Sequence, residues 1–183
     1  MSNKLIELKN LTKNFDDQQV LRGINLDIYE NEFLTLLGPS GCGKTTTLRI
    51  IAGFEEPSGG EVLFNGIEIS KLPPYKREIN TVFQKYALFP WKTVMGNVEM
   101  SQKLKGVDKK VRQEKAQEYI NLVGLKGFEN SLPKQLSGGM KRKLMVCRAL
   151  LTSPEILLLD EPTAGMDALS RRQMWNLLRK LNG

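Results

Sequence analysis

The 183-residue sequence lacks several features that mark other classes of protein. No apolar run has the length that spans a bilayer, and the N-terminus leads into alternating residues without the apolar region of a signal peptide. Two cysteines, Cys42 and Cys147, do not form a disulfide framework. We also find no internal repeat, low-complexity tract or flexible linker. These absences predict one cytosolic domain, and the complete absence of histidine bears on catalysis below.

The composition is that of an ordinary globular protein with a basic balance. Hydrophobic residues make up 40% of the chain and charged residues 26%. The 27 Lys and Arg residues outnumber the 20 Asp and Glu residues and give a formal net charge of +7. Such a charge suits nucleotide phosphates, nucleic acid or an anionic membrane surface, and it does not choose among them.

One stretch organises the rest of the chain. Residues 33–37 form a continuous apolar run that predicts a strand covered on both faces, and Thr45 to Ala52 predicts a helix ended by Gly53. Between them the sequence fits G-x-x-x-x-G-K-[ST]. Glycines let the backbone wrap around a phosphate chain, and a helix N-terminus favours anions. A glycine-rich turn that binds nothing is the alternative. The flanking patterns favour a nucleoside triphosphate site made of Gly38, Pro39, Ser40, Gly41, Cys42, Gly43, Lys44, Thr45 and Thr46.

Side chains with distinct chemical roles belong to this predicted site. Lys44 can reach the β- and γ-phosphates, and the Thr45 hydroxyl can bind Mg²⁺. Residues 156–159 predict an apolar strand that ends in Asp160 and Glu161. Asp160 could hold Mg²⁺ through water, and Glu161 could polarise the water that attacks the γ-phosphate. Strands often end in acids, so the second pattern is weak alone and gains its weight from the phosphate loop.

The other elements are predicted from hydrophobic periodicity and turn residues. Asn65-Gly66 is a strong signal for a two-residue hairpin, and Asp108 has the character of a helix N-cap. The predicted strands are Leu5–Leu8, Ile24–Ile28, Glu61–Phe64, Ile67–Ile69, Ile79–Phe83 and Glu155–Leu159. The predicted helices are one after Asp108 that ends near Gly124, with Val111, Tyr119, Ile120 and Val123 on one stripe, then Met140–Leu151 and Leu169–Leu181.

A second glycine pair precedes the helix that begins near Met140. In Leu136-Ser137-Gly138-Gly139, Ser137 could be an ordinary cap that accepts a hydrogen bond from a helical N–H. The other interpretation is a second phosphate-binding helix start, with glycines for close approach. Both interpretations stay open on these residues alone.

Together these motifs resemble those of the ATP-binding cassette (ABC) ATPases. LSGG before a helix, the phosphate loop, Gln84 after its strand and Asp160-Glu161 follow in the family's order over nearly the whole chain. The resemblance implies an α/β fold: a P-loop NTPase core with a mixed central sheet, an antiparallel β subdomain and a helical insert. It implies one nucleotide-binding domain over residues 1–183, with its core at 1–85 and 146–183 and the helical subdomain at about 86–145.

The resemblance also implies roles for single residues near the nucleotide. Phe15 would stack on adenine, and a minor core residue is the alternative. Gln84 would contact Mg²⁺ and the attacking water, and a surface polar residue is the alternative. The implied catalytic residues are therefore Glu161, Gln84 and Lys44, with Thr45, Gln84 and Asp160 at the metal.

Further roles implied by the resemblance concern partners. Ser137, Gly138 and Gly139 would act in trans on ATP bound to the phosphate loop of another subunit, and Asp167 would lie in the loop that links the two sites. Residues 86–91 would lie where the coupling helix of a membrane permease docks. A second anion-binding helix start would complete the electrostatic cage around the γ-phosphate.

The sequence departs from the family pattern at two points. Met140 replaces the glutamine of LSGGQ. The family's switch histidine, on a strand after the final helix, has no counterpart, because the sequence ends at Gly183 and contains no histidine. That strand would lie between residues 33–37 and 156–159, so these two strands either pair directly or the chain is a fragment. We therefore expect weak or absent turnover even where nucleotide binds. The resemblance is also uneven along the chain. Residues 1–90 resemble polyamine- or sugar-type importers, and residues 91–134 resemble nitrate- and sulfonate-type importers. The segments LSGGMKRKL and AGMDALSRRQMW resemble the lipid-exporting subfamily.

The leading prediction is the ATP-binding and ATP-hydrolysing subunit of an ABC membrane transporter, using ATP and Mg²⁺. It would form an ATP-dependent homodimer or heterodimer and bind permease subunits at the cytoplasmic face of the membrane. A nucleotide-binding but catalytically impaired module is the alternative. Soluble ABC ATPases of DNA repair, chromosome maintenance or translation are disfavoured, because the insert lacks sustained heptads and the chain has one cassette. GTPases lack support because no N-K-x-D motif occurs, and no nucleic-acid partner is expected. The solute and its direction of transport are not predicted.

Overall fold

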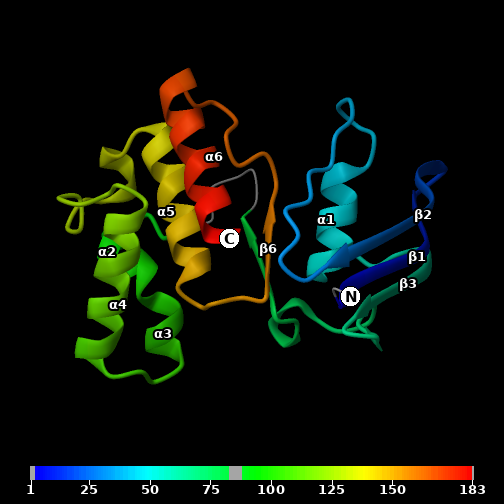
Figure 1. Ribbon diagram of the computed structural model, residues 1–183, viewed down its shortest axis with the longest axis horizontal. Helices are drawn as coiled ribbons and strands as arrows, with labels where there is room; N and C mark the ends of the chain where they lie inside the picture. The colour runs from blue at the N-terminus through cyan, green and yellow to red at the C-terminus, as the bar shows by residue number, and fades with distance from the viewer. Residues whose placement is uncertain (1–2, 83–87, 183) are drawn as a thin grey trace. The chain divides into compact units, whose positions relative to one another are not determined.

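A computed structural model describes residues 3–82 and 88–182 of the chain. The chain divides into two compact units, an N-terminal unit up to Ile79 and a C-terminal unit over Asn80–Leu181. Each unit has its own sheet and helices (Figure 1).

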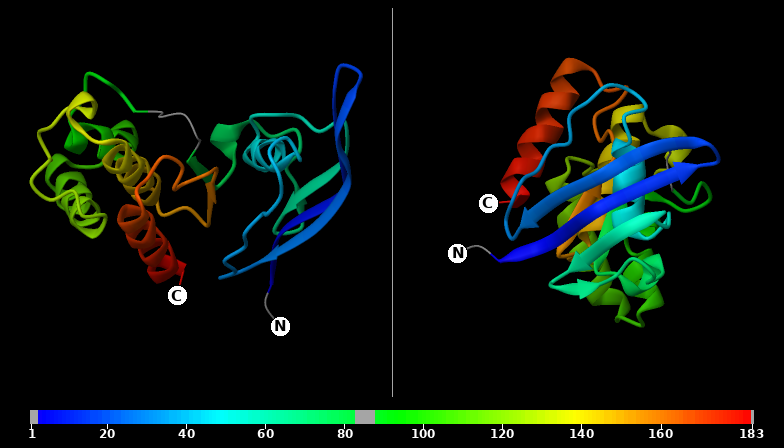
Figure 2. Two further views of the ribbon diagram at one scale, coloured as in Figure 1. Left: turned by 90° about the horizontal axis from the view of Figure 1, so that it is seen from above. Right: turned by 90° about the vertical axis from the view of Figure 1, so that its right-hand side faces the viewer.

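The N-terminal unit is built on an antiparallel sheet with the strand order β2-β1-β3-β4. One helix, α1, lies across a face of this sheet (Figure 2). Asn65 and Gly66 have φ angles of 49° and 76°, which confirms the predicted two-residue hairpin. The elements are β1 (Lys4–Phe15), β2 (Gln18–Tyr29), α1 (Lys44–Ala52), β3 (Gly59–Phe64), β4 (Ile67–Glu68) and the short 3-10 helix η1 (Pro74–Lys76).

The core of the N-terminal unit lies between the sheet and α1. Ile6 and Leu8 are two residues apart on β1, so they point to the same face, and Leu8 lies opposite Val62 of β3. All three are buried, as are Ile50 and Ile51 of α1. This packing fixes α1 against the sheet, and α1 begins at the predicted phosphate loop.

The predicted strand at residues 33–37 is wrong. The segment has no regular secondary structure, and it is exposed rather than covered on both faces: Phe33 is 41%, Leu34 38% and Leu37 89% exposed. An isolated run of apolar residues becomes a strand only where a neighbouring strand accepts its backbone hydrogen bonds. The paired strands of the described chain are β1 to β4 and β5 with β6.

The C-terminal unit is mainly helical. Its helices are α2 (Val94–Val98), α3 (Met100–Leu104), α4 (Lys109–Leu122), η2 (Pro133–Gln135), α5 (Gly138–Leu150) and α6 (Ala168–Asn182). Strand β5 (Ile79–Val82) pairs with β6 (Ile156–Leu159), and the Asp160 N–H donates to the Val82 carbonyl at 3.0 Å. None of the helices in residues 3–82 and 88–182 is long and apolar enough to cross a membrane.

Two apolar clusters hold the C-terminal unit together. Residues of α2, α4 and α5 form one cluster, which includes Val94, Ile120 and Leu144. The other joins α5 and α6 through Val146 and Met174. Helix α5, which follows the glycine pair, belongs to both clusters and is therefore the best-anchored helix of this unit.

The predicted helix after Asp108 is confirmed. The Asp108 carboxylate accepts hydrogen bonds from the Lys110 and Val111 N–H groups, at 2.8 and 3.4 Å. Ile120 and Val123 of the predicted apolar stripe are buried. Val111 is 45% exposed, because the stripe meets its partner helices only beyond the first turn.

Candidate functional site

The predicted phosphate loop, residues 38–45, joins the segment after β2 to helix α1. Gly41 and Gly43 have φ angles of 82° and 93°, in the left-handed region that favours glycine. A Cβ atom on Gly43 would lie 2.5 Å from Leu21 Cδ2, and one on Gly38 would lie 2.6 Å from Cys42 Sγ. Side chains at these two glycines would therefore displace the Leu21 and Cys42 side chains that pack against them.

Lys44 closes the loop with its own side chain. The ammonium donates to the carbonyl oxygens of Gly38 and Pro39, at 2.6 and 2.7 Å, and lies 3.4 Å from Cys42 Sγ. The positive charge is thus fixed at the centre of the loop, beside its glycines. This is the position from which an ammonium can neutralise a phosphate chain that the loop backbone surrounds.

The first turn of α1 is built to receive an anion. Its N-cap is Gly43, no side chain caps the turn, and none of its residues is acidic. The Thr47 hydroxyl donates to the Gly43 carbonyl at 3.0 Å, which leaves that side chain occupied and buried. Backbone N–H groups at an uncapped N-terminus carry the positive end of the helix dipole.

The net charge of the chain does not create this positive site. The N-terminal unit contains 9 Lys and Arg against 11 Asp and Glu, whereas the C-terminal unit contains 18 against 9. The phosphate loop therefore lies in the acidic unit. Its affinity for anions has to come from Lys44 and from oriented backbone N–H groups.

Phe15 lies at the end of β1 with its ring 42% exposed. The Lys13 ammonium is 4.8 Å from the centre of the ring, and it also pairs with the Glu55 carboxylate at 2.7 Å. An exposed aromatic ring beside a cation offers one face for stacking on a base. Its role toward adenine stays a prediction.

The two carboxylates after β6 have different surroundings. Asp160 is 6% exposed, whereas Glu161 is exposed. Glu161 also has a φ angle of 49°, a left-handed conformation that is rare for glutamate. Residues held in such sparsely populated conformations cluster at functional sites. The role of Glu161 toward water stays a prediction.

The segment Leu136-Ser137-Gly138-Gly139, here called the signature segment, and Asp167 lie close together within the C-terminal unit. The Ser137 hydroxyl accepts the Met140 N–H at 3.2 Å, so its structural role as the N-cap of α5 is confirmed. A Cβ atom on Gly139 would lie 3.8 Å from the Ser170 hydroxyl oxygen, which places the glycine pair beside the start of α6. Asp167 caps α6 there: its carboxylate accepts the Ser170 N–H at 2.9 Å.

Gln84 and residues 86–87 of the predicted permease contact lie outside the described residues. In the rest of that contact, Trp91 is 72% exposed, and its ring lies 5.7 Å from that of Phe89. Fully buried Asn97 holds this segment, because its amide donates to the carbonyls of Phe89, Lys92 and Thr93. The sequence did not single out Asn97, since an asparagine inside a short helix carries no distinctive signal.

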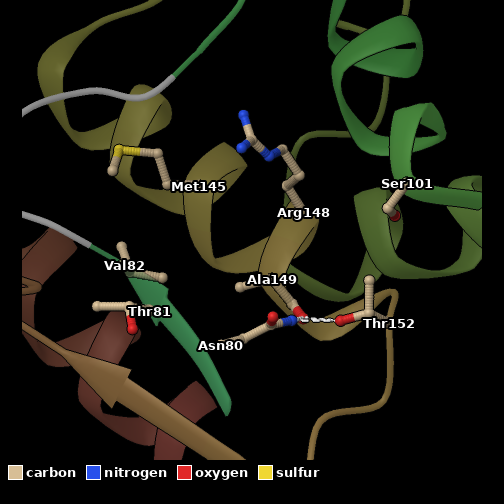
Figure 3. A pocket seen from close by; sticks show the side chains of 8 residues that line it. All are labelled: Asn80, Thr81, Val82, Ser101, Met145, Arg148, Ala149 and Thr152. Atoms are coloured by element: carbon tan, nitrogen blue, oxygen red, sulfur yellow. Dashed lines mark hydrogen bonds between the residues drawn. The ribbon is translucent and has the colours of Figure 1, made fainter. Parts of the chain in front are cut away.

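A cavity of about 180 Å³ lies in the C-terminal unit between β5, α3 and α5 (Figure 3). Asn80 closes one side by donating to the Ala149 carbonyl at 2.7 Å and to the Thr152 hydroxyl. The Arg148 guanidinium points away from Asn80 and Thr81 (Figure 3). The lining residues include none of the residues predicted to bind nucleotide, so this cavity is not the predicted site.

Arg77 is a further buried residue that the sequence analysis missed. It is 8% exposed, and burial lowers the pKa of its guanidinium. Its bonds reach back to Ile50 and Ile51, which are 27 and 26 residues away in the sequence. No local pattern announces such contacts, and arginines are mostly exposed.

Comparison with known proteins places these motifs in one family. Residues 21–164 match the family described as "ABC transporter". A "Spermidine/putrescine import ATP-binding protein PotA" of Spiroplasma citri is 51% identical over 100% of this chain and 52% of its own length. The protein of the same description from Acetivibrio thermocellus is 52% identical over 98% of this chain and 51% of its own.

The fold is also found among solved structures. A dimeric post-hydrolysis state of the ATP-binding cassette MJ0796 bound to ADP and Pi superposes with a TM-score of 0.88 at 34% identity, over 97% of this chain and 83% of that one. This likeness confirms the predicted fold class. The chain spans about half the length of the curated relatives it matches. Because those relatives match 98–100% of the chain under one description, the predicted three-part mixture of subfamilies is not confirmed.

Proposed function

The chain belongs to the ABC transporter family, and on this premise we propose that it is the ATP-binding and ATP-hydrolysing domain of a membrane transporter. One observation carries the proposal: Lys44 is fixed over a glycine loop that opens into an uncapped helix. This arrangement supplies a cation and the positive end of a helix dipole in the place where a triphosphate needs both.

We infer further that the transported solute is a polyamine and that transport is import. The support is the description shared by relatives that are 51% and 52% identical over nearly the whole chain. Solute selection would belong to the permease. The domain would work at the cytoplasmic face of the membrane, held there by its permease.

The residues proposed to hold Mg²⁺ fit that ion by their donor atoms. The Thr45 hydroxyl, the Asp160 carboxylate and the Gln84 amide all offer hard oxygen ligands, which Mg²⁺ prefers. Among the described residues no three His, Cys, Asp or Glu side chains gather as a metal site. When bound, Mg²⁺ would neutralise charge on the β- and γ-phosphates.

In the proposed reaction this chain mainly orients and stabilises. Lys44 and the first turn of α1 bind the phosphate chain, and Phe15 stacks on adenine. Glu161 accepts a proton from the attacking water and is helped by its exposed, conformationally fixed position. Gln84 orients that water. The rate of hydrolysis would rise because these groups are already placed around the bound phosphate chain and stabilise the charge that develops on it.

The proposed dimer explains the second glycine motif. Ser137, Gly138 and Gly139 would complete the surroundings of a γ-phosphate held by another subunit, with Asp167 beside them. Support comes from their common position at the start of α5 and α6, where both helix N-termini meet. ATP would then hold two subunits together, and hydrolysis would release them.

The proposed permease contact includes Trp91. Trp91 is 72% exposed. It lies on a segment that buried Asn97 fixes through hydrogen bonds from its amide to three backbone carbonyls. A large exposed aromatic side chain on a rigid segment is typical of an interface anchor.

ATP-dependent dimerisation of Glu161→Gln tests the proposal. Removing the proposed base should trap an ATP-bound dimer, which light scattering after gel filtration detects with Mg-ATP and not with Mg-ADP. Glu155→Gln, an exposed glutamate just before β6, is the matched control and should stay monomeric under turnover conditions. A Glu161→Gln chain that remains monomeric at saturating Mg-ATP would contradict the trans role. Nucleotide binding by the parent without phosphate release would favour the alternative, a nucleotide-binding but catalytically impaired module.

A further inference from the structure

The most unusual buried charge in the N-terminal unit belongs to Arg77. Its guanidinium forms no ion pair among residues 3–82 and 88–182. Instead it donates to four backbone carbonyls: Ile50 and Ile51, both at 2.7 Å, Leu72 at 2.8 Å and Ser70 at 3.1 Å. A buried cation is costly unless such bonds and a favourable field compensate for lost hydration.

The compensating field comes from helix α1. Ile50 and Ile51 lie in its last turn, where the helix dipole is negative, and the Ile50 carbonyl also accepts the Gly53 N–H at 3.1 Å. Gly53 ends the helix with a φ angle of 81°. A Cβ atom at Gly53 would lie 2.6 Å from Arg77 Nε and 2.8 Å from Cζ, so the close approach of the guanidinium itself requires a glycine there.

The other two carbonyls connect this helix end to the sheet. Ser70 and Leu72 belong to the turn after β4, and the Ser70 hydroxyl accepts the Val62 N–H of β3 at 3.0 Å. One guanidinium therefore bonds α1 to the turn that borders the sheet. The planar guanidinium of arginine spreads its N–H donors over three nitrogen atoms and so suits four divergent acceptors. A lysine ammonium has fewer N–H donors, and all of them are on one nitrogen atom.

We propose that Arg77 is a positioning residue for the phosphate loop. The loop forms the N-terminal end of the nine-residue α1, and Arg77 fixes its C-terminal end, so the two groups act on opposite ends of one rigid element. Loss of the guanidinium lets α1 shift against the sheet, and Lys44 and its glycines lose their placement around phosphate. This inference rests on the proposed function, because it assumes that the loop binds a triphosphate.

The test is the affinity of folded variants for Mg-ATP, measured by titration with a fluorescent ATP analogue. Arg77→Met should raise the Kd by roughly 3- to 30-fold at a temperature at which circular dichroism shows the chain fully folded. Arg77→Lys, which keeps the charge and the aliphatic stem, should recover part of this loss. Arg49→Met is the matched control: it removes an exposed guanidinium from the same last turn and should leave the Kd within about twofold.

A merely stabilising role would lower the unfolding temperature of Arg77→Met and leave the Kd of the folded protein unchanged, and this result would overturn the proposal. If Arg77→Met does not fold, Arg77→Lys decides, since an unchanged Kd in that variant would equally overturn it. Lys44→Ala in the same series separates the two proposals. If Lys44→Ala binds as tightly as the parent, the phosphate-loop assignment fails. If only Lys44→Ala weakens binding, the loop assignment stands and the role of Arg77 is refuted.

Discussion

Two glycine-rich segments start helices in this chain, and they are built differently. Helix α1 follows Gly43, whose backbone is in the left-handed region, and no side chain caps the first turn of the helix. Helix α5 follows Ser137, whose hydroxyl accepts the Met140 N–H at 3.2 Å. The first segment contains a lysine whose ammonium donates to two loop carbonyls, whereas the glycines of the second segment, Gly138 and Gly139, are exposed and half-buried.

The difference explains why similar compositions serve different purposes. An uncapped first turn with an ammonium beside it can hold an anion without help from another molecule. A turn that Ser137 already caps is satisfied internally, so it adds little affinity by itself and gains a role only when a phosphate is brought to it. We therefore propose that α1 provides primary nucleotide binding and α5 the subunit contact.

The largest effect on the affinity for Mg-ATP should come from a substitution at the start of α1. Lys44→Ala removes the ammonium over the loop, and we expect the Kd for Mg-ATP to rise roughly 100-fold, or about 2.7 kcal/mol. Titration with a fluorescent ATP analogue measures this change. Lys71→Ala, an exposed lysine of the same unit, controls for charge and should bind like the parent. Equal affinity of Lys44→Ala and the parent would remove the distinction between the two helix starts.

At the start of α5, substitutions of Ser137 should separate the stability of the C-terminal unit from dimerisation. Ser137→Ala loses the cap and should destabilise the C-terminal unit by about 1 kcal/mol, measured by urea unfolding. Ser137→Asp keeps a capping acceptor and should keep that stability. Its negative charge would oppose a partner's γ-phosphate, so a Glu161→Gln chain that also carries Ser137→Asp should fail to dimerise with Mg-ATP. Normal dimerisation of this double variant would show that Ser137 caps α5 and does nothing more.

The smallest effect concerns Asp167, which caps α6 beside the signature glycines. Hydrogen bonds from the side chain and N–H of Ser170 hold the pKa of the Asp167 carboxyl below its usual range. Because the folded-state pKa is lowered, the stabilisation is present above the unfolded-state pKa and is lost as the pH falls through the folded-state value.

Asp167→Asn should therefore make α6 less sensitive to acid while keeping an N-cap at neutral pH. Far-UV circular dichroism from about pH 5 to about pH 2 measures the change. Asp17→Asn, in the turn after β1, controls for the loss of one carboxylate. Identical acid titrations of Asp167→Asn and the parent would contradict the assigned cap.

Local sequence signals predicted the elements that depend on local chemistry. Asn65-Gly66 specified a hairpin because both positions need positive φ, and Asp108 specified a helix start because its carboxylate can accept two N–H groups. The glycine-rich turn into α1 was predictable for the same reason, since its glycines and Lys44 lie within eight residues of one another, and its phosphate binding stays a prediction.

Features that depend on distant neighbours were not predictable in this way. Residues 33–37 have the composition of a buried strand, yet strand formation depends on a hydrogen-bonded neighbour, and the segment is exposed and irregular. Arg77 and Asn97 reach their positions through bonds to backbone carbonyls, which any sequence supplies. Periodicity and motif spacing contain no information about such bonds.

The central claim, that the loop at residues 38–45 encloses a triphosphate, can be tested with a cysteine already inside it. Cys42 is exposed, whereas Cys147 is buried in α5, and burial raises the pKa of its thiol to about 12. A maleimide at neutral pH should therefore label Cys42 alone, because only the thiolate reacts rapidly. With Mg-ATP at ten times its Kd, we predict that labelling slows by roughly tenfold and that Lys44→Ala removes this protection. Labelling of Cys42 at the same rate with and without saturating Mg-ATP would contradict the claim.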